Sequence, residues 1–202
     1  MLANDNYDQT FNNFSQVPTI PYRCIDALIS SQSDEAEILW KLLKYNDVDC
    51  LSKDNLTEDE KYALIWVGDS LEQNYSVFIK PLIGSAVDTA LEQSQLRIYR
   101  STETPTNKID TTLCYEFDFI TNEKDSLVRK DGILMERTDL MESMFLSIMN
   151  GRDLGVGVLV YDRILSRSCS SALAMNNSKT YFGRATVMAL QYINPDTGGS
   201  CS

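Results

Sequence analysis

Alternation of apolar and polar residues with a period of two predicts four β-strands in the second half of the chain. The clearest is the segment 110–121, in which the aromatic residues lie on one side of the strand and two carboxylates, Glu116 and Asp118, lie on the other. Turn-forming residues separate this segment from the strand before it. The other predicted strands are 96–100, 155–165 and 180–193.

Apolar residues that recur every three or four positions predict helices elsewhere. The strongest local signal is LTEDEKYALIWVGD, residues 56–69, in which Thr57 and Glu60 have the spacing of a capping box at a helix N-terminus. Two more helices are expected upstream of it: one over 22–29, and one that has Ser31 or Ser33 as its N-cap and ends near Asn46.

A further helix is predicted after residue 137, with Thr138 as its N-cap and Gly151 as its C-cap. Its apolar residues include several methionines, which are found both in cores and in adaptable binding grooves. We expect core packing against the aromatic side of the strand 110–121, because that side needs an apolar partner. The helix residues concerned are Met141, Met144, Phe145 and Met149.

The order helix, helix, strand, strand, helix, strand, strand predicts an α+β fold. We expect an antiparallel sheet of about four strands with one crossing helix, plus an N-terminal helical extension and an extended arm. The Ser- and Asn-rich segment 166–180 is expected to be a long polar connection. The single domain divides into an arm at 1–21, a helical region at 22–84, the sheet core at 85–195 and a flexible tail at 196–202.

Composition narrows the classes of partner. The net charge of -11 and the pI near 4.4 argue against a surface that neutralises phosphates, so specific nucleic-acid binding is not expected. No apolar run approaches the roughly 18 residues that cross a bilayer, and the first residues lack the plan of a signal peptide. We therefore expect the protein to be made in the cytosol and not to associate with a membrane. The five cysteines are far apart and include no CxxC pair, which favours reduced thiols.

Candidate chemistry is limited by the lack of histidine in the chain, which removes the commonest general base and most zinc and iron ligand sets. Glu116 and Asp118 admit two interpretations: an acid/base or metal-binding pair, or the solvated or interface side of a half-buried strand. The second is favoured, because any exposed strand with two acids has this spacing. We therefore expect no enzyme activity, no catalytic residue, no metal site and no cofactor.

Charge is distributed unevenly along the chain. Acidic residues outnumber basic ones between 32 and 72, whereas basic residues slightly exceed acidic ones after Gly151. This pattern fits an ordinary solvated surface, and it also fits a head-to-tail interface in which unlike surfaces of identical subunits close into a ring. The candidate interface residues are Tyr7, Phe11, Phe14, Trp66, Arg163 and Arg167.

Most of the chain after Pro18 has the order of elements of a known class of proteins. The run PYRCIDALISSQSDEAEILWKLLKYNDVDCLSKDNLTEDEKYALIW is followed by YEFDFIT, LMESMFLSIMNG, GVGVLVYDR and a final long strand after NNSKTYFGRATVMA. This arrangement resembles neck proteins of tailed bacteriophages, the adaptor or tail-terminator-like rings between portal and tail. It is similar in particular to the ring proteins of crAss-like phages.

The resemblance implies a structural virion protein that is assembled in the host cytoplasm. Its subunits would form a ring, a dodecamer or a hexamer, that contacts the portal protein and other neck and tail proteins around the DNA channel. Double-stranded DNA would pass without specific binding, and acids such as Glu116 and Asp118 would repel its phosphates if they faced the channel.

Two alternatives to the connector stay open at this stage. One is a metal-dependent hydrolase or nuclease that uses Glu116, Asp118 and Asp162. The other is an adaptor that binds a host protein through the acidic helices and Trp66.

Overall fold

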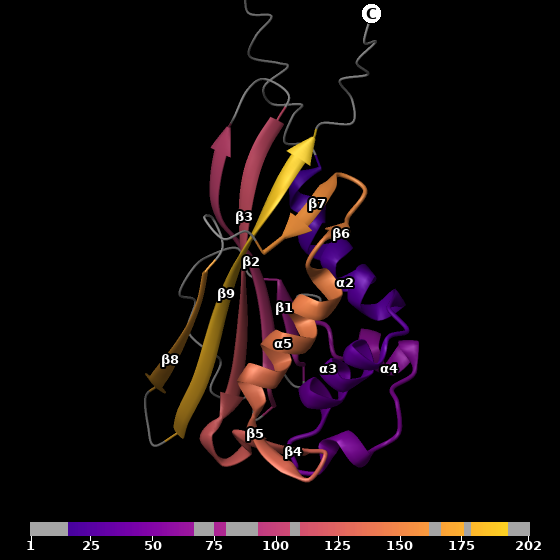
Figure 1. Cartoon of the computed structure of the whole chain (residues 1–202), viewed down its shortest axis with the longest axis vertical. Helices are drawn as coiled ribbons and strands as arrows, with labels where there is room; N and C mark the ends of the chain where they lie inside the picture. The colour runs from indigo at the N-terminus through magenta and orange to yellow at the C-terminus, as the bar shows by residue number, and fades with distance from the viewer. Residues whose placement is uncertain are drawn as a thin grey trace, which may run out of the picture.

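The computed structural model of the chain describes residues 16–66, 75–79, 93–105, 110–161, 167–175 and 179–193. Its architecture is mixed α+β, with the helices packed beside a long sheet (Figure 1). The α-helices are α2 (Ile20–Ser30), α3 (Asp34–Lys44), α4 (Glu58–Ala63) and α5 (Arg137–Met149), and the short 3-10 helices are η1 (Val17–Thr19), η2 (Cys50–Ser52) and η3 (Glu123–Asp125). The strands are β1 (Val77–Ile79), β2 (Gln95–Pro105), β3 (Asp110–Asn122), β4 (Leu127–Lys130), β5 (Ile133–Glu136), β6 (Arg152–Asp153), β7 (Gly157–Val160), β8 (Arg167–Met175) and β9 (Lys179–Ile193).

The main sheet has seven strands in the order β1-β2-β3-β9-β7-β6, with β8 also paired to β9. β1 runs parallel to β2, and the other pairs are antiparallel. The α+β class is confirmed, but the expected antiparallel sheet of about four strands is wrong in strand number and in the direction of β1. β1 and β6 have three and two residues, too few for a period of two to show in the sequence.

The segment 166–180 contains β8, so the expectation of an unstructured polar connection is wrong there. Its backbone pairs with β9 from Arg167, opposite Val187, to Met175, opposite Lys179. Small Ser and Ala residues give this strand a weak hydrophobic alternation, yet an antiparallel pair needs only the regular main-chain hydrogen bonds that β9 supplies. β9 thus has β3 on one edge and both β7 and β8 on the other.

The predicted N-terminal helices are present with shifted ends. α2 begins at Ile20, inside the segment assigned to the arm, and Ile20 is completely buried in the core. α4 ends at Ala63 although the apolar pattern continues. The chain leaves the helix there because Ile65 forms a parallel bridge with Val77 of β1.

The crossing helix α5 also begins earlier than predicted. Its N-cap is Glu136 rather than Thr138, and the Thr138 hydroxyl donates a hydrogen bond to Glu136 Oε1 at 2.7 Å. Gly151 follows the helix end with a φ of +81°, a left-handed conformation that glycine adopts without strain.

The core lies between α5 and the aromatic side of β3, as the sequence predicts. Phe145 of α5 packs against Phe117 and Phe119, with ring centroids 4.5 Å and 5.4 Å apart. Offset and tilted aromatic pairs at these distances add stability beyond the burial of their area. Tyr115 is also buried on this side, and its hydroxyl donates to the carbonyl oxygen of Val17, which ties the start of the described chain to the sheet.

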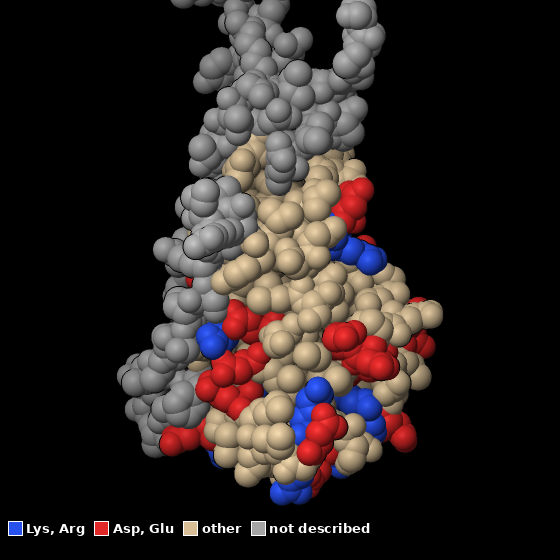
Figure 2. All heavy atoms as spheres, in the orientation of Figure 1, with Lys and Arg blue, Asp and Glu red and all other residues tan. Residues whose placement is uncertain are grey.

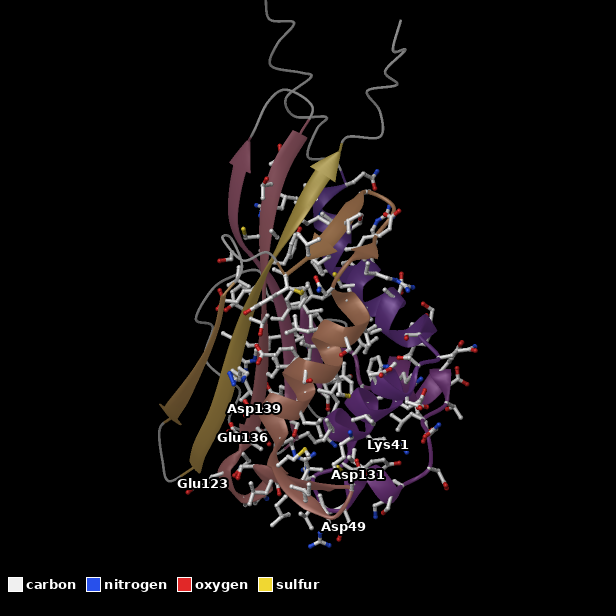
Figure 3. The ribbon with its side chains drawn as sticks, viewed as in Figure 1. Lys41, Asp49, Glu123, Asp131, Glu136 and Asp139 are labelled. Atoms are coloured by element: carbon white, nitrogen blue, oxygen red, sulfur yellow. The ribbon has the colours of Figure 1, made fainter. Side chains whose placement is uncertain are left out.

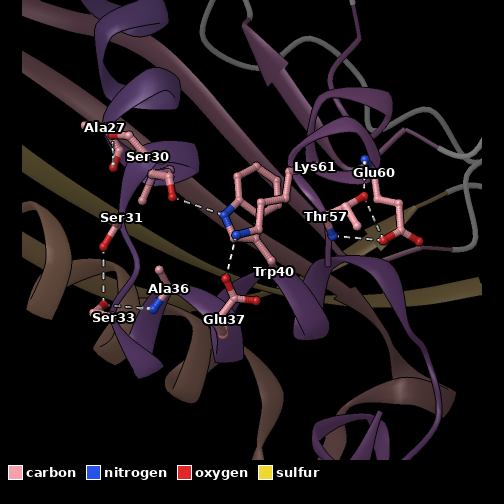
Figure 4. A network of polar contacts seen from close by, with 11 residues as sticks. Ala27, Ser30, Ser31, Ser33, Ala36, Glu37, Trp40, Thr57, Glu60 and Lys61 are labelled. Atoms are coloured by element: carbon pink, nitrogen blue, oxygen red, sulfur yellow. Dashed lines mark hydrogen bonds and ion pairs between the residues drawn. The ribbon is translucent and has the colours of Figure 1, made fainter. Parts of the chain in front are cut away.

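Polar contacts orient the N-terminal helices (Figure 4). Ser33 caps α3, and the Thr57–Glu60 capping box has both of its hydrogen bonds, so both predicted caps are confirmed. Lys61 of α4 is 4% exposed, and its Nζ lies 2.6 Å from Glu37 Oε1 of α3. A buried ion pair adds little net stability, but it disfavours any packing of the two helices that separates the charges.

Arg137, the first residue of α5, is completely buried and bonds to main-chain carbonyls. Four of these carbonyls belong to the last turn of α3 and the residues that follow it, and the fifth belongs to η3. Because the last carbonyls of a helix have no intrahelical donor and carry a partial negative charge, a guanidinium is well suited to satisfy them. Nη1 donates to Leu42 and Tyr45 at 3.1 and 2.8 Å, Nη2 to Asn46 and Asp47 at 3.1 and 3.0 Å, and Nε to Asp125 at 2.7 Å.

We expect Arg137→Lys to lower the free energy of unfolding by about 3 kcal/mol, because an ammonium cannot reach all of these carbonyls and unsatisfied buried acceptors are costly. Urea denaturation followed by circular dichroism measures the change. Arg129→Lys is the control: Arg129 is exposed and pairs with Asp49, so its replacement should cost less than about 1 kcal/mol. Equal losses in the two variants would contradict the role of Arg137.

Candidate functional site

Glu116 and Asp118 belong to a polar cluster on the side of the sheet that faces away from α5. Cross-strand pairing places Arg97 of β2 opposite Asp118 and Tyr99 opposite Glu116. The Tyr99 hydroxyl donates a hydrogen bond to Asp118 Oδ1 at 3.3 Å. Arg97 Nη2 donates to Gln95 Oε1 on the same strand at 2.9 Å. Two adjacent strands thus bring together the carboxylate pair that the sequence singles out and three polar residues that it does not.

The cluster is less exposed than a solvated sheet surface. Gln95, Arg97 and Tyr99 are 1%, 5% and 6% exposed, and the two carboxylates are partly buried between them. Alternation along β2 does not reveal this burial, because a covered polar side and a wet polar side have the same sequence pattern.

Burial sets the proton affinity of the cluster. The pKa of Asp118 is raised to about 6. Loss of hydration is the largest cause and the neighbouring Glu116 carboxylate adds to it, whereas the Tyr99 hydrogen bond and the Arg97 charge lower the pKa. Burial also raises the pKa of the Tyr99 phenol, so it remains a hydrogen-bond donor. Asp118 therefore exchanges a proton close to neutral pH.

A metal role for this cluster has little support in the described part of the chain. There, no group of three or more His, Cys, Asp or Glu residues is placed to hold a metal ion. Asp162, the third carboxylate of the hydrolase hypothesis, lies outside the described residues. Arg97 already supplies a positive charge beside Asp118.

A second polar cluster joins α5 to β9 and is not evident from the sequence. Arg184 Nη2 lies 2.6 Å from Asp139 Oδ1, and its Nε lies 2.9 Å from Glu142 Oε2. The Thr186 hydroxyl donates to the buried Glu142 carboxylate. Figure 3 shows Glu136 and Asp139 at the first turn of α5, on the side near β9. This cluster holds the helix at a fixed position across the sheet.

The structure describes the side chain of one predicted interface residue, Trp66. Tyr7, Phe11, Phe14 and Arg163 lie outside the described residues, and the side chain of Arg167 at the start of β8 is also outside them. Trp66 is partly buried, and its ring lies 6.1 Å from that of Phe78 on β1.

Large apolar side chains are exposed on three surfaces of the described chain. They are Tyr22 of α2 and Tyr62 of α4, called the helix surface, and Val158 and Tyr161 at β7, called the β7 surface. The hairpin surface has Leu127 and Leu134 on one side of the β4–β5 hairpin and Ile133 on the other. Figure 2 shows acidic and basic side chains gathered over the lower part of one face, and an uncharged area above them. Tyr62 also lines a groove between α2, α4 and β6, together with Arg23, Asp26, Glu58 and Arg152.

The hairpin surface belongs to β4 and β5, which the sequence analysis missed. Asp131 and Gly132 form the turn between the two strands and have positive φ values of 52° and 79°. An Asp-Gly pair between short alternating segments is typical of a two-residue hairpin, so the signal was present in the sequence.

Comparison with known proteins adds no assignment: no family model, no curated protein and no solved structure matches the chain. Among the helices of the described residues, none combines the length and the apolar character needed to span a bilayer.

We expect Asp118→Asn to change how stability depends on pH. Because the native pKa of Asp118 is about 6 and its ordinary value is 3.8, the native state binds this proton more tightly than the unfolded state does. The stability that the proton provides is present below about pH 4 and is lost as the pH rises through about 6. The difference in unfolding free energy, wild type minus Asp118→Asn, should therefore fall by about 3 kcal/mol between pH 3 and pH 7.

Chemical denaturation at a series of pH values measures this difference. Asp131→Asn is the matched control, because its side chain is 84% exposed and Asn also tolerates positive φ. Its difference from the wild type should stay nearly flat over the same range. A flat difference for Asp118→Asn as well would show that Asp118 titrates normally.

Proposed function

We propose that the chain is a structural subunit of the head-tail connector of a tailed bacteriophage, where it forms a ring between the portal and the tail. In this proposal the ring is a homo-oligomer, a dodecamer or a hexamer, located in the neck of the virion. The order of elements that resembles neck proteins supports it, and so does an α+β subunit with a helix laid across a sheet.

The observation that carries the proposal is the exposure of apolar side chains on three separate surfaces. Tyr22, Tyr62, Ile133 and Leu134 are 60%, 52%, 60% and 54% exposed. Single exposed apolar residues are ordinary, whereas grouped ones mark contact sites. A ring subunit meets unlike surfaces of its two neighbours and also the adjoining rings, so it needs several such surfaces.

Charge supports passage of DNA rather than its capture. The described residues 16–66 contain ten Asp and Glu residues and five Lys and Arg residues, and the whole chain has a net charge of -11. An acidic channel wall would repel phosphates and let double-stranded DNA slide through without sticking. In this proposal the exposed acids of α3 and α4, such as Asp34 and Asp59, are additional candidates for that wall beside Glu116 and Asp118.

A carboxylate-dependent hydrolase is the second candidate, and the Asp118 pKa near 6 beside Glu116 is the observation in its favour. Calorimetric titration with magnesium or manganese tests it. Metal binding that is lost in the Glu116→Gln, Asp118→Asn double variant would support the hydrolase. If the wild type gives no heat of binding, the hydrolase hypothesis is ruled out.

We expect the purified full chain to form rings, alone or with the portal protein of a tailed phage, because burial of the helix and hairpin surfaces favours association. Mass photometry gives the subunit number, and negative-stain class averages give the rotational symmetry. A monomer at every concentration, with and without portal protein, would contradict the connector function.

A variant of the helix surface separates assembly from folding. The Tyr22→Ser, Tyr62→Ser double variant should keep the wild-type circular dichroism spectrum and reduce the ring fraction by about tenfold, because aromatic residues dominate the energy of most interfaces. Lys53→Gln is the control, because Lys53 is the exposed C-cap residue of η2. This variant should leave the ring fraction unchanged.

A further inference from the structure

The β4–β5 hairpin lies at the end of the molecule where α5 begins (Figure 1). Positive φ at both Asp131 and Gly132 defines a two-residue turn whose twist matches that of the strands. In the described part of the chain, no atom lies within 4 Å of the position that a Cβ at Gly132 would occupy. On the inner side of the hairpin, Val128 is completely buried and anchors it to the core.

The two outer edges of the hairpin differ. The Arg129 N–H on the outer edge of β4 donates to the Val48 carbonyl at 2.7 Å, so that edge is partly covered. Next to the two-residue turn, Lys130 and Ile133 form a hydrogen-bonded pair, so the following pair, Arg129 and Leu134, has no mutual main-chain hydrogen bonds. The main-chain N–H and C=O of Leu134 therefore point away from β4, toward the outer edge of β5. Among the described residues, β5 pairs with β4 alone.

The side chains of this free edge are apolar. Ile133 and Leu134 are 60% and 54% exposed, and Leu127 on the same outer side as Leu134 is 49% exposed. Natural edge strands are usually protected from pairing by lysine, proline or a bulge, none of which occurs within β5. A strand with free hydrogen-bonding groups and exposed apolar residues favours the addition of another strand.

We propose that the outer edge of β5 pairs with the same edge of a second copy of this chain. The two β5 strands run antiparallel about a two-fold axis at Leu134, which places Leu134 beside Leu134 of the partner subunit and Ile133 opposite Met135 of the partner subunit. The result is a continuous four-stranded sheet, β4-β5-β5-β4.

The sequence of β5 is compatible with this pairing. In this register Glu136 lies opposite Gly132 of the partner subunit, so no two like charges are directly opposed. Apolar residues contact apolar residues on both sides of the joined sheet. Leu134 packs against Leu134 of the partner subunit on the outer side, and Ile133 packs against Met135 of the partner subunit on the inner side. Both sides of the new sheet thus bury apolar area that each hairpin exposes alone.

This contact is independent of the proposed ring. A two-fold contact uses one surface twice and closes with two subunits, whereas a ring needs two unlike surfaces. The β5 contact therefore joins two free subunits, or subunits of two rings, and its presence does not depend on the connector function.

Charge at the two-fold axis tests the pairing. Leu134→Lys and Leu134→Glu each put two like charges side by side, and each should weaken self-association by about tenfold or more. An equimolar mixture of the two variants should restore association as a heterodimer, because lysine of one copy then meets glutamate of the other. Sedimentation velocity measures the dissociation constants, and native mass spectrometry identifies the heterodimer.

Tyr62→Lys is the matched control, because Tyr62 is 52% exposed on a different surface and the substitution adds the same charge. It should leave the two-fold contact intact, although it weakens ring formation if the connector proposal is right. Circular dichroism verifies that each variant is folded.

Hydrogen exchange gives a second readout without mutation. The Leu134 amide should become protected as the protein concentration rises, whereas the Met135 amide, which faces β4 within each hairpin, should change less. A monomeric wild type, an unaffected association in both Leu134 variants, or a loss that the mixture does not restore would each overturn the β5 pairing. Rings that form while β5 stays unpaired would leave the connector function standing.

Discussion

The cage of carbonyls around Arg137 is the interaction on which the layered structure depends. A fully buried guanidinium is tolerated only where its donors are satisfied, and here they are satisfied by main-chain oxygens of the segment that follows α3 and of η3. Because these acceptors come from two distant parts of the chain, the charge can be buried only when the helical layer and the start of α5 are already in place. The same residue thus links the N-terminal helices to the sheet.

A second contact fixes α5 from the other side. Arg184 of β9 pairs with Asp139 and Glu142, so the helix is held to the sheet through its first two turns as well as through Phe145. The polar contacts favour one direction of the helix, while the apolar contacts of Leu140, Met141, Phe145 and Met149 bury its inner side. This division is common in small cores, where apolar packing alone permits several similar arrangements.

Local rules predicted the elements that local interactions determine. The Thr57–Glu60 capping box and the alternation in β3 are both properties of a few neighbouring residues, and both are present in the structure. β1 has three residues and β8 is rich in Ser and Ala, so their own residues carry little periodic signal. For the candidate site, the Glu116–Asp118 pair was found from its spacing, but the burial of Arg97 and Gln95 beside it results from tertiary packing.

The position of β9 has a consequence for how the protein is made. β9 is the last strand of the described residues, yet it lies inside the sheet, with β3 on one edge and β7 and β8 on the other. Until β9 has left the ribosome, β3 has no partner on that edge, β7 can pair with β6 alone, and β8 lacks the strand it pairs with. Because β9 pairs late and with strands that are distant in sequence, such as β3, folding is slowed and an aggregation-prone intermediate is left. A nascent chain that stops before Lys179 lacks β9 and would therefore be a substrate for chaperones or proteases rather than a smaller version of the native domain.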